Sequence, residues 1–423
     1  MLIEQALQNN YSLSATLARV QSAKAQLGVS SASLYPDLNF NASSNADIES
    51  LDEVKSASVG VSSSWELDLW GRISALEEKA QWDLISKEAL HKARLNAVAG
   101  GVSATWLNWV AESHKHQLLT SQYQRTETAL KVINRRFALG KNSVTDIWQQ
   151  KRLLESITSQ QASSLAKLKT YEKQLMVWLG GENTTLASLE AKGLPTLTIL
   201  PEQAVPLSAL QSRPDVQQAY ADLQANNANL AAAVTEQFPR LTLRANYSTQ
   251  KNSSADLFDD WLGNLIASLT VPIFNAGEVE NKIKQREFNL AASAADFSQT
   301  WLDAIYDVEV RLINEQQLYQ VSKQLAIQLA LAKKTERVTA QQYLSGKSRY
   351  LALLKAQETS LALERQSIDA QKLLLNNRVQ LYRELSHGNF DQTHSFSPVS
   401  LELTQKSSEA PSTKPAKNLE ALR

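Results

Sequence analysis

Two similar stretches, "LGKNSVTDIW" (139–148) and "LSGKSRYLAL" (344–353), decide how this chain folds. Gly140 and Gly346 are 346 − 140 = 206 residues apart. The second stretch contains Gly-Lys-Ser, the end of a phosphate-binding P-loop, but that loop needs another glycine five residues earlier and a buried strand before it. Position 341 is Gln, and the preceding "ALAKKTERVTAQQY" is charged and made of good helix formers. We therefore predict two glycine turns and no nucleotide site.

The same spacing relates other parts of the chain, which indicates a tandem duplication. "SASLYPDLNFNAS" (31–43) matches "VTEQFPRLTLRAN" (234–246), and "SSSWELDLWGRI" (62–73) matches "SLTVPIFNAGEV" (268–279). "KTYEKQLMVWLGG" (169–181) matches "LNNRVQLYRELSHG" (375–388). The period is far too long for a solenoid. We predict two structural repeats over residues 1–181 and 207–388.

Proline and serine mark the segments outside these repeats. "KGLPTLTILPEQAVPLSAL" holds three prolines, and we interpret 182–206 as an extended linker at the equator of the molecule. Residues 389–423 are rich in Ser, Pro and Lys, a composition that cannot bury enough apolar surface to fold. We predict a disordered tail there.

Each repeat contains two segments in which apolar and polar residues alternate. The first pair is "LNFNASS" (38–44) and "VGVSSSWELDL" (59–69), and residues 241–247 and 265–273 form the second. Alternation with a period of two predicts strands with one apolar and one polar face. The connections at 45–55 and 248–261 are polar and acidic, so we predict loops there.

Two long helical hairpins follow the strands. No proline occurs from Gly71 to Phe137 or from Gly277 to Tyr343, and a helix of ~65 residues spans ~100 Å. Spacing by sevens in the returning helices predicts coiled-coil packing rather than a globular core. The residues in these rows are Leu354, Leu361, Ile368, Leu375 and Tyr382, and Ile147, Leu154, Leu168 and Leu175, with Gln161 interrupting the second row. Gly140 and Gly346 then supply the positive φ that ends the first helix of each hairpin.

Composition excludes several classes of protein. Lys plus Arg and Asp plus Glu are both 43, and this balance argues against a nucleic-acid partner. The chain has no Cys and five dispersed His, and it contains none of HExxH, GxSxG or GxGxxG. We therefore expect no enzyme activity, no metal, no cofactor and no nucleotide.

A membrane role through strands stays open. No apolar run reaches the ~18–20 residues of a transmembrane helix. Short alternating strands are typical of a β-barrel, but four strands cannot close one, and an open edge is forbidden in lipid. Closure requires copies of the chain, and three copies supply twelve strands and twelve long helices. The fold class is thus mainly α, with hairpins forming an α-barrel in a trimer and four strands per chain shared in a 12-stranded β-barrel.

At this point the sequence resembles the TolC/NodT-type outer-membrane efflux factors. The matching stretches are "LIEQALQNNYSL", "SASLYPDLNFNAS", "WELDLWGRI", "SRPDVQQAYADLQANNANLAAA", "FPRLTLRANYS", "PIFNAGEVENKI" and "YLSGKSRYLALLKAQ", which span residues 2–388 in the family's order. The resemblance implies a homotrimeric channel in the outer membrane with an α-barrel in the periplasm. Its implied partners are a periplasmic adaptor, an inner-membrane RND-type transporter and outer-membrane lipid, and its implied function is passive export of small molecules such as drugs.

The resemblance also implies a periplasmic gate near the hairpin turns. The matching residues are Thr145, Asp146, Tyr343, Leu351 and Lys355. Some members of the family place a Leu and, four residues later, an Asp as constriction rings; Leu351 matches the Leu, whereas Lys355 stands at the Asp position and reverses its charge. A carboxylate at Asp146 is also common at a helix start, and Tyr343 and Leu351 also fit coiled-coil packing, so these alternatives stay open.

Two further sets of residues complete the expected sites. The adaptor-docking surface consists of Leu139, Gly140, Lys141, Ser345, Gly346, Lys347 and Arg349. Trp65 and Trp70 lie where strand meets helix, and we interpret them as aromatics at the membrane interface, with packing at the α/β junction as the alternative.

The start of the sequence departs from the family. Many members carry a leader and an N-terminal Cys for lipid attachment, and "MLIEQALQNN" shows neither. A misassigned start, a trimmed chain or a decayed gene would each account for this, and without a leader we expect the chain to stay in the cytoplasm. The alternative function is a soluble coiled-coil scaffold whose sheet packs its apolar face under its own helices.

Overall fold

The structure, a computed structural model, describes residues 2–47, 50–181, 193–195, 197, 207–251 and 260–385. The chain divides into two units, 1–388 and 389–423, and every described residue lies in the first. The predicted tail lies outside the described residues, and so does most of the predicted linker.

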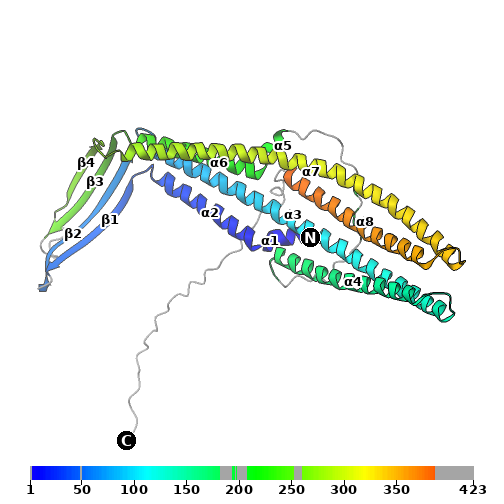
Figure 1. Cartoon of the computed structure of the whole chain (residues 1–423). Helices are drawn as coiled ribbons and strands as arrows, with labels where there is room; N and C mark the ends of the chain where they lie inside the picture. The colour runs from blue at the N-terminus through cyan, green and yellow to red at the C-terminus, as the bar shows by residue number, and fades with distance from the viewer. Residues whose placement is uncertain are drawn as a thin grey trace, which may run out of the picture. The chain divides into compact units, whose positions relative to one another are not determined.

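The two halves of the chain have the same order of elements (Figure 1). The first half contains α1 (Leu2–Asn9), α2 (Tyr11–Ala32), β1 (Asp37–Asp47), β2 (Ser50–Leu67), α3 (Arg72–Ala138) and α4 (Val144–Trp178). The second contains α5 (Leu207–Gln211), α6 (Pro214–Thr235), β3 (Arg240–Lys251), β4 (Leu262–Thr270), α7 (Glu278–Leu344) and α8 (Tyr350–Leu385). Both α3 and α7 have 67 residues. Within this unit the sheet lies at one end and the α3–α4 and α7–α8 turns at the other.

The long helices begin and end at the predicted glycines. The residue before each helix is a glycine in the left-handed region, Gly71 at φ 75° and Gly277 at φ 81°. Before α3, the Asp68 carboxylate accepts hydrogen bonds from the backbone N–H groups of Ile73 and Ser74, each at 2.8 Å. These bonds satisfy donors that have no partner within the helix.

The four strands form one antiparallel sheet in the order β1-β2-β3-β4. The central pair, β2 with β3, joins the two halves, and Val61 lies opposite Tyr247. Large apolar side chains on this sheet are not covered by the chain's own helices. Four examples, two on each outer strand, are Leu38 (75% exposed), Phe40 (70%), Leu265 (75%) and Leu269 (64%).

The strand boundaries correct three predictions. The loop predicted at 45–55 is wrong in extent, because β1 continues to Asp47 and β2 begins at Ser50, with register shifts between them. β2 ends at Leu67 rather than residue 69, since Asp68 is used to cap α3. β4 ends at Thr270 rather than residue 273, where Pro272 has no N–H to continue the ladder. In the other predicted loop, β3 continues to Lys251, and residues 252–259 lie outside the described residues.

The helices form a row in which α3 is central. α3 packs against α1, α2, α4, α6 and α8, whereas the main neighbours of α7 among the described residues are α6 and α8. Near the turns the order across the row is α4, α3, α8, α7, and near the sheet it is α2, α3, α6, α7. Among the described residues, no helix is both long and apolar enough to pass through a membrane.

The predicted heptad rows are partly confirmed. Leu354, Leu361 and Leu375 are buried, but Tyr382 is 55% exposed. In α4, Leu175 of the predicted row is fully buried, but nearer the turn the buried row lies three residues later than predicted and runs through Gln150, Ile157 and Ser164. Both rows belong to one coiled-coil seam, since heptad positions a and d are three residues apart.

Candidate functional site

Both hairpins turn through the same hydrogen-bonded structure. Gly140 has φ 70° and Gly346 has φ 77°, as predicted. In the first turn the N–H of Lys141 donates to the carbonyl of Arg136 at 2.9 Å, and in the second the N–H of Lys347 donates to that of Gln342 at 2.8 Å. This pattern closes a helix on a left-handed residue, which a side chain with a Cβ adopts only with strain.

Asp146 is part of the start of α4. Its carboxylate accepts the N–H of Ser143 and the amide of Asn142, both at 3.0 Å. The Ser143 hydroxyl accepts the N–H of Asp146 at 3.3 Å, which completes a capping box. Within one chain, the helix-start interpretation of Asp146 therefore describes its contacts.

Tyr343 joins the two hairpins. Its side chain is 6% exposed, and its hydroxyl donates to Oδ1 of Asn142 at 2.8 Å. The Arg136 guanidinium lies 4.6 Å from the centre of the Tyr343 ring and also donates to Asn142 at 3.1 Å. Asn142 thus connects a tyrosine of one hairpin to an arginine and, through Asp146, to the helix start of the other.

A second tyrosine, at the start of α8 on the other side of the turn, also links the two hairpins. The Tyr350 hydroxyl donates to Oε1 of Gln150, whose amide donates to the carbonyl of Thr126 at 3.0 Å. The two tyrosine rings meet edge to face at 5.6 Å. Burial, followed by the nearby Tyr343 and Asp146, raises the pKa of Tyr350, so its phenol stays a neutral donor.

Sequence reasoning missed the partners Arg136, Asn142, Gln150 and Tyr350. Tyr343 lies at the end of α7 and Tyr350 at the start of α8, on the two sides of the turn, so their spacing of seven is not a heptad signal. Nothing in the sequence identified Asn142 or Gln150, because both belong to the opposite hairpin.

The other predicted gate and docking residues are exposed, and one of them, Thr145, shares a hydrogen bond with the Ser143 hydroxyl of the capping box. Leu351 is 59% exposed, Thr145 and Lys355 are exposed, and Leu139 is 71% exposed. The polar docking residues Lys141, Ser345, Lys347 and Arg349 are also exposed or partly so. Among the ion pairs of the described residues, none joins Asp146 to Arg349 or Lys355. Arg136 is linked to Asp146 through Asn142, which accepts a hydrogen bond from Arg136 and donates one to Asp146.

A buried carboxylate links the hairpins further from the turns. Glu364 accepts Gln122 and Arg125 at 2.9 Å each and pairs with Lys333 at 3.1 Å. Burial opposes its ionisation, but these donors outweigh burial and hold the pKa of Glu364 below 4.5. Helices α3, α7 and α8 are therefore joined at one level by a charged group.

The two tryptophans lie at the junction of sheet and helices. The Trp65 indole donates to the carbonyl of Leu34 at 3.0 Å, and that of Trp70 to the carbonyl of Pro239 at 2.8 Å. Trp70 is 50% exposed, and its ring lies 5.1 Å from that of Phe238. Both have a satisfied N–H and an accessible apolar ring, as interfacial tryptophans do.

Comparison with known proteins agrees with this architecture. The profile of the family described as outer membrane efflux protein matches residues 2–181 and 205–387. The outer membrane protein OprJ of Pseudomonas aeruginosa is 28% identical, over 93% of this chain and 85% of its own length. The solvent efflux pump outer membrane protein SrpC of Pseudomonas putida is 27% identical, over 92% and 84%.

Solved structures have the same fold. The crystal structure of a membrane protein from Pseudomonas aeruginosa superposes with a TM-score of 0.85 at 26% identity, covering 91% of this chain and 92% of that one. The chain therefore belongs to the outer membrane efflux protein family, and it acts in the outer membrane as the channel component of an efflux system.

Proposed function

We propose that three copies of the chain close into one export channel. The observation that carries this proposal is the set of unpaired edges in a single chain. β1 and β4 each have one unpaired side, and α7 lacks a neighbour on the side away from α6 and α8. Joining β4 of one copy to β1 of the next, and α7 to the next copy's α2 and α4, pairs every edge. Three copies give a barrel of 12 strands and an α-barrel of the same symmetry.

The exposed apolar face of the sheet supports a lipid-facing barrel. Leu38, Phe40, Leu265 and Leu269 are each more than 60% exposed, which is costly in water and favourable in lipid. A soluble scaffold would cover these side chains with its own helices, and these helices do not. Trp65 and Trp70 would then lie at the boundary between lipid and water.

A tandem duplication accounts for the symmetry of the chain. The equal lengths of α3 and α7, and the left-handed glycines before and after each, support repeats over 1–181 and 207–388. In this proposal the linker 182–206 crosses the equator between the repeats.

The hairpin turns combine a gate with an adaptor-docking surface. Tyr343 and Asn142 hold the two hairpins together, and Thr145, Asp146, Leu351 and Lys355 surround the axis of the closed trimer. The exposed Leu139 at one turn and Leu344 (64%) at the other offer apolar contacts to a periplasmic adaptor, which leads to an RND-type transporter. These turns lie at the end of the unit opposite the sheet (Figure 1).

The names of the relatives favour passive conduction. They describe a solvent efflux pump protein, a cation efflux system protein and a pyoverdine export protein on one scaffold. Because these cargoes differ so much in chemistry, we infer that the other components of each system select the cargo and that the channel conducts it passively.

Native mass spectrometry of detergent-extracted protein tests the proposal. We expect a homotrimer that depends on detergent, because its apolar sheet face needs an apolar solvent. A stable monomer that stays in solution without detergent would overturn the trimer and the barrel together.

A further inference from the structure

An exposed stripe follows one face of α7. Tyr306 is 65% exposed and Ile313 66%, and Glu309 between them is also exposed. The buried face of the helix carries Val308 and Glu315 instead. At 3.6 residues per turn, Ile313 lies about 160° around the helix from Glu315. The stripe therefore points away from both helices that pack on α7.

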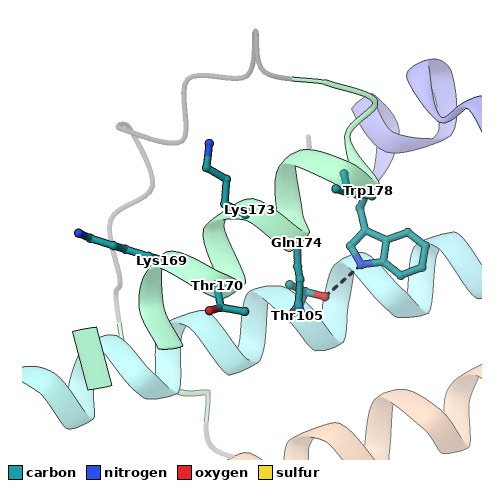
Figure 2. A pocket seen from close by; sticks show the side chains of 7 residues that line it. Thr105, Lys169, Thr170, Lys173, Gln174 and Trp178 are labelled. Carbon is teal, nitrogen blue, oxygen red and sulfur yellow. Dashed lines mark hydrogen bonds between the residues drawn. The ribbon is translucent and has the colours of Figure 1, made fainter. Parts of the chain in front are cut away.

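A groove of ≈ 770 Å³ lies on α4 (Figure 2). In the row of helices, α4 is at the opposite end from α7. The groove is lined by Thr105, Lys169, Thr170, Lys173, Gln174, Val177 and Trp178. The Trp178 indole donates to Thr105 at 3.2 Å and lies over Gly101, where a Cβ would come within 2.5 Å of the ring. Val177 at the groove is 76% exposed. Gly101 and Thr105 thus hold the Trp178 ring as one wall of the groove, and the side chain of Val177 stays exposed beside it.

Side-chain contacts across the row place groove and stripe at the same height. Trp178 of α4 contacts Thr105 of α3, and three residues along α3 Asn108 receives the amide of Asn376 of α8 at 2.8 Å. Half a turn further along α8 is Arg378, whose Nε donates to Glu315 of α7 at 2.9 Å. These three hydrogen bonds connect α4, α3, α8 and α7 in turn. Ile313 is two residues from Glu315, where the series ends on α7.

Complementary charges continue this match toward the sheet. α2 begins beside the groove, because its cap Asn10 donates to the carbonyl of Trp178 at 3.0 Å. The exposed Arg19 lies 19 − 10 = 9 residues after Asn10, which is ~13 Å nearer the sheet along α2. On α7, Glu309 lies 313 − 309 = 4 residues before Ile313, which is ~6 Å nearer the sheet. α2 runs toward the sheet and α7 away from it. Side chains lean toward the N-terminus of their helix, so Arg19 and Glu309 lean toward the same level.

Rotation about a closed ring's axis does not shift a copy along that axis. A residue on α7 therefore meets α4 or α2 of the next copy at its own height. We infer that Ile313 of one copy occupies the α4 groove of a second copy and contacts Val177, while Glu309 pairs with the second copy's Arg19. This inference rests on the proposed trimer and names the surfaces that join its α-barrel.

A cysteine pair tests the contact, since the natural chain has no Cys. In the double variant Val177→Cys/Ile313→Cys, oxidation of the detergent-extracted protein should give covalent trimers on a non-reducing gel. Bonding within one chain is excluded because α3 and α8 separate α4 from α7. The matched control is Val177→Cys/Leu373→Cys, because Leu373 is 52% exposed at a similar height on the inner helix α8. It should give monomers only.

Charge reversal provides a second measurement. Arg19→Glu should weaken each interface by about two- to fivefold in its equilibrium constant, because it places a carboxylate opposite Glu309. Adding Glu309→Arg should restore the interface, since the pair is then exchanged rather than lost. The readout is the trimer fraction in native mass spectra at fixed protein concentration.

The outcomes separate this inference from the proposed function. Trimers that form in native spectra but give no covalent product at 177 and 313, and that ignore the charge changes, overturn the contact and leave the channel intact. Monomers in native spectra of the natural chain overturn both.

Discussion

Helices α3 and α7 have the same length and the same glycine before their first turn, yet they have opposite environments. α3 contains twenty buried residues and α7 only five. The difference comes from their neighbours, because five of the described helices pack on α3 (α1, α2, α4, α6 and α8) and two pack extensively on α7 (α6 and α8). The same preceding glycine and the same absence of proline thus produce helices of equal length. The position of each helix in the row decides how many of its residues are buried. In the proposed trimer, the exposed side of α7 faces the next copy of the chain.

The N-caps of the two 22-residue helices differ in a similar way. Asn10 begins α2 with a neutral side chain that donates to the carbonyl of Trp178 at 3.0 Å. Arg213 begins α6 and is only 5% exposed, and it pairs with Asp215 at 2.7 Å and Glu384 at 3.0 Å. Trp178 and Glu384 are 384 − 178 = 206 residues apart, so both caps reach the corresponding end of a hairpin. The helix start of the second repeat is thus held by a buried ion pair between Arg213 and Glu384, whereas that of the first is held by a hydrogen bond from Asn10 to a backbone carbonyl.

Removing these two caps should give the largest contrast. Arg213→Met leaves the mostly buried Glu384 without one of its cations, and we expect a loss of about 3 kcal/mol in the free energy of unfolding. Asn10→Ala should lose about 1 kcal/mol. Chemical unfolding of the detergent-solubilised protein, followed by circular dichroism, measures both. Equal losses would show that the buried charge adds nothing to the second repeat.

The buried Glu364 should make stability depend on pH. Its folded pKa lies below its ordinary 4.5, so its contribution is complete above 4.5 and is lost as pH falls through the folded pKa. Glu364→Gln should cost about 1.5–3 kcal/mol at neutral pH and flatten the acid limb of a stability profile. The corresponding residue of the first repeat, Thr158, is exposed, and Thr158→Ala is the control. An unchanged acid limb would assign the acid sensitivity to other carboxylates.

Both hairpin turns should respond to a β-branched side chain. Gly140→Val and Gly346→Val place such a residue at positive φ, at about 1–3 kcal/mol each. We expect export to fall, as measured by drug susceptibility of cells, while trimers persist. Gly28→Ala within α2, where a Cβ meets no atom within 4 Å, is the neutral control. Full export by both valine variants would exclude the turns as the adaptor contact.

The smallest change replaces a residue of the second turn by the residue type found at the same position of the first. Tyr343 corresponds to Phe137, 206 residues earlier, which is 44% exposed. Tyr343→Phe removes only the hydroxyl bonded to Asn142, worth about 0.5–1.5 kcal/mol, and should raise the conductance of purified channels in planar bilayers. Phe137→Leu should leave conductance unchanged. If Tyr343→Phe conducts like the natural channel, this bond does not hold the gate closed.

Direct substitution of the predicted gate charges completes the comparison. Asp146→Ala also removes the cap of α4, so its effect on conductance must be compared with Ser143→Ala, which removes the cap and keeps the carboxylate. Lys355→Asp should change ion selectivity, because it reverses an exposed charge. If Asp146→Ala and Ser143→Ala act alike, Asp146 serves only to start the helix.

The sequence by itself determined the elements. Glycine, proline and period-two alternation act within a few residues, so Gly71, Gly140, Gly277 and Gly346 located the ends of both long helices. The resemblance to TolC/NodT-type efflux factors predicted the function and indicated that the region around the two turns is its functional site.

Tertiary structure decided which residues meet. The tyrosines Tyr343 and Tyr350 find Asn142 and Gln150 about 200 residues away in sequence, and no local pattern encodes such a pair. Pairing between strands extended β1 and β2 into a polar segment predicted as a loop, since backbone hydrogen bonds form regardless of side-chain polarity. Burial on α3 and exposure on α7 likewise depend on what packs beside each helix, because free energy from burial belongs to contacts and not to the helix that carries them.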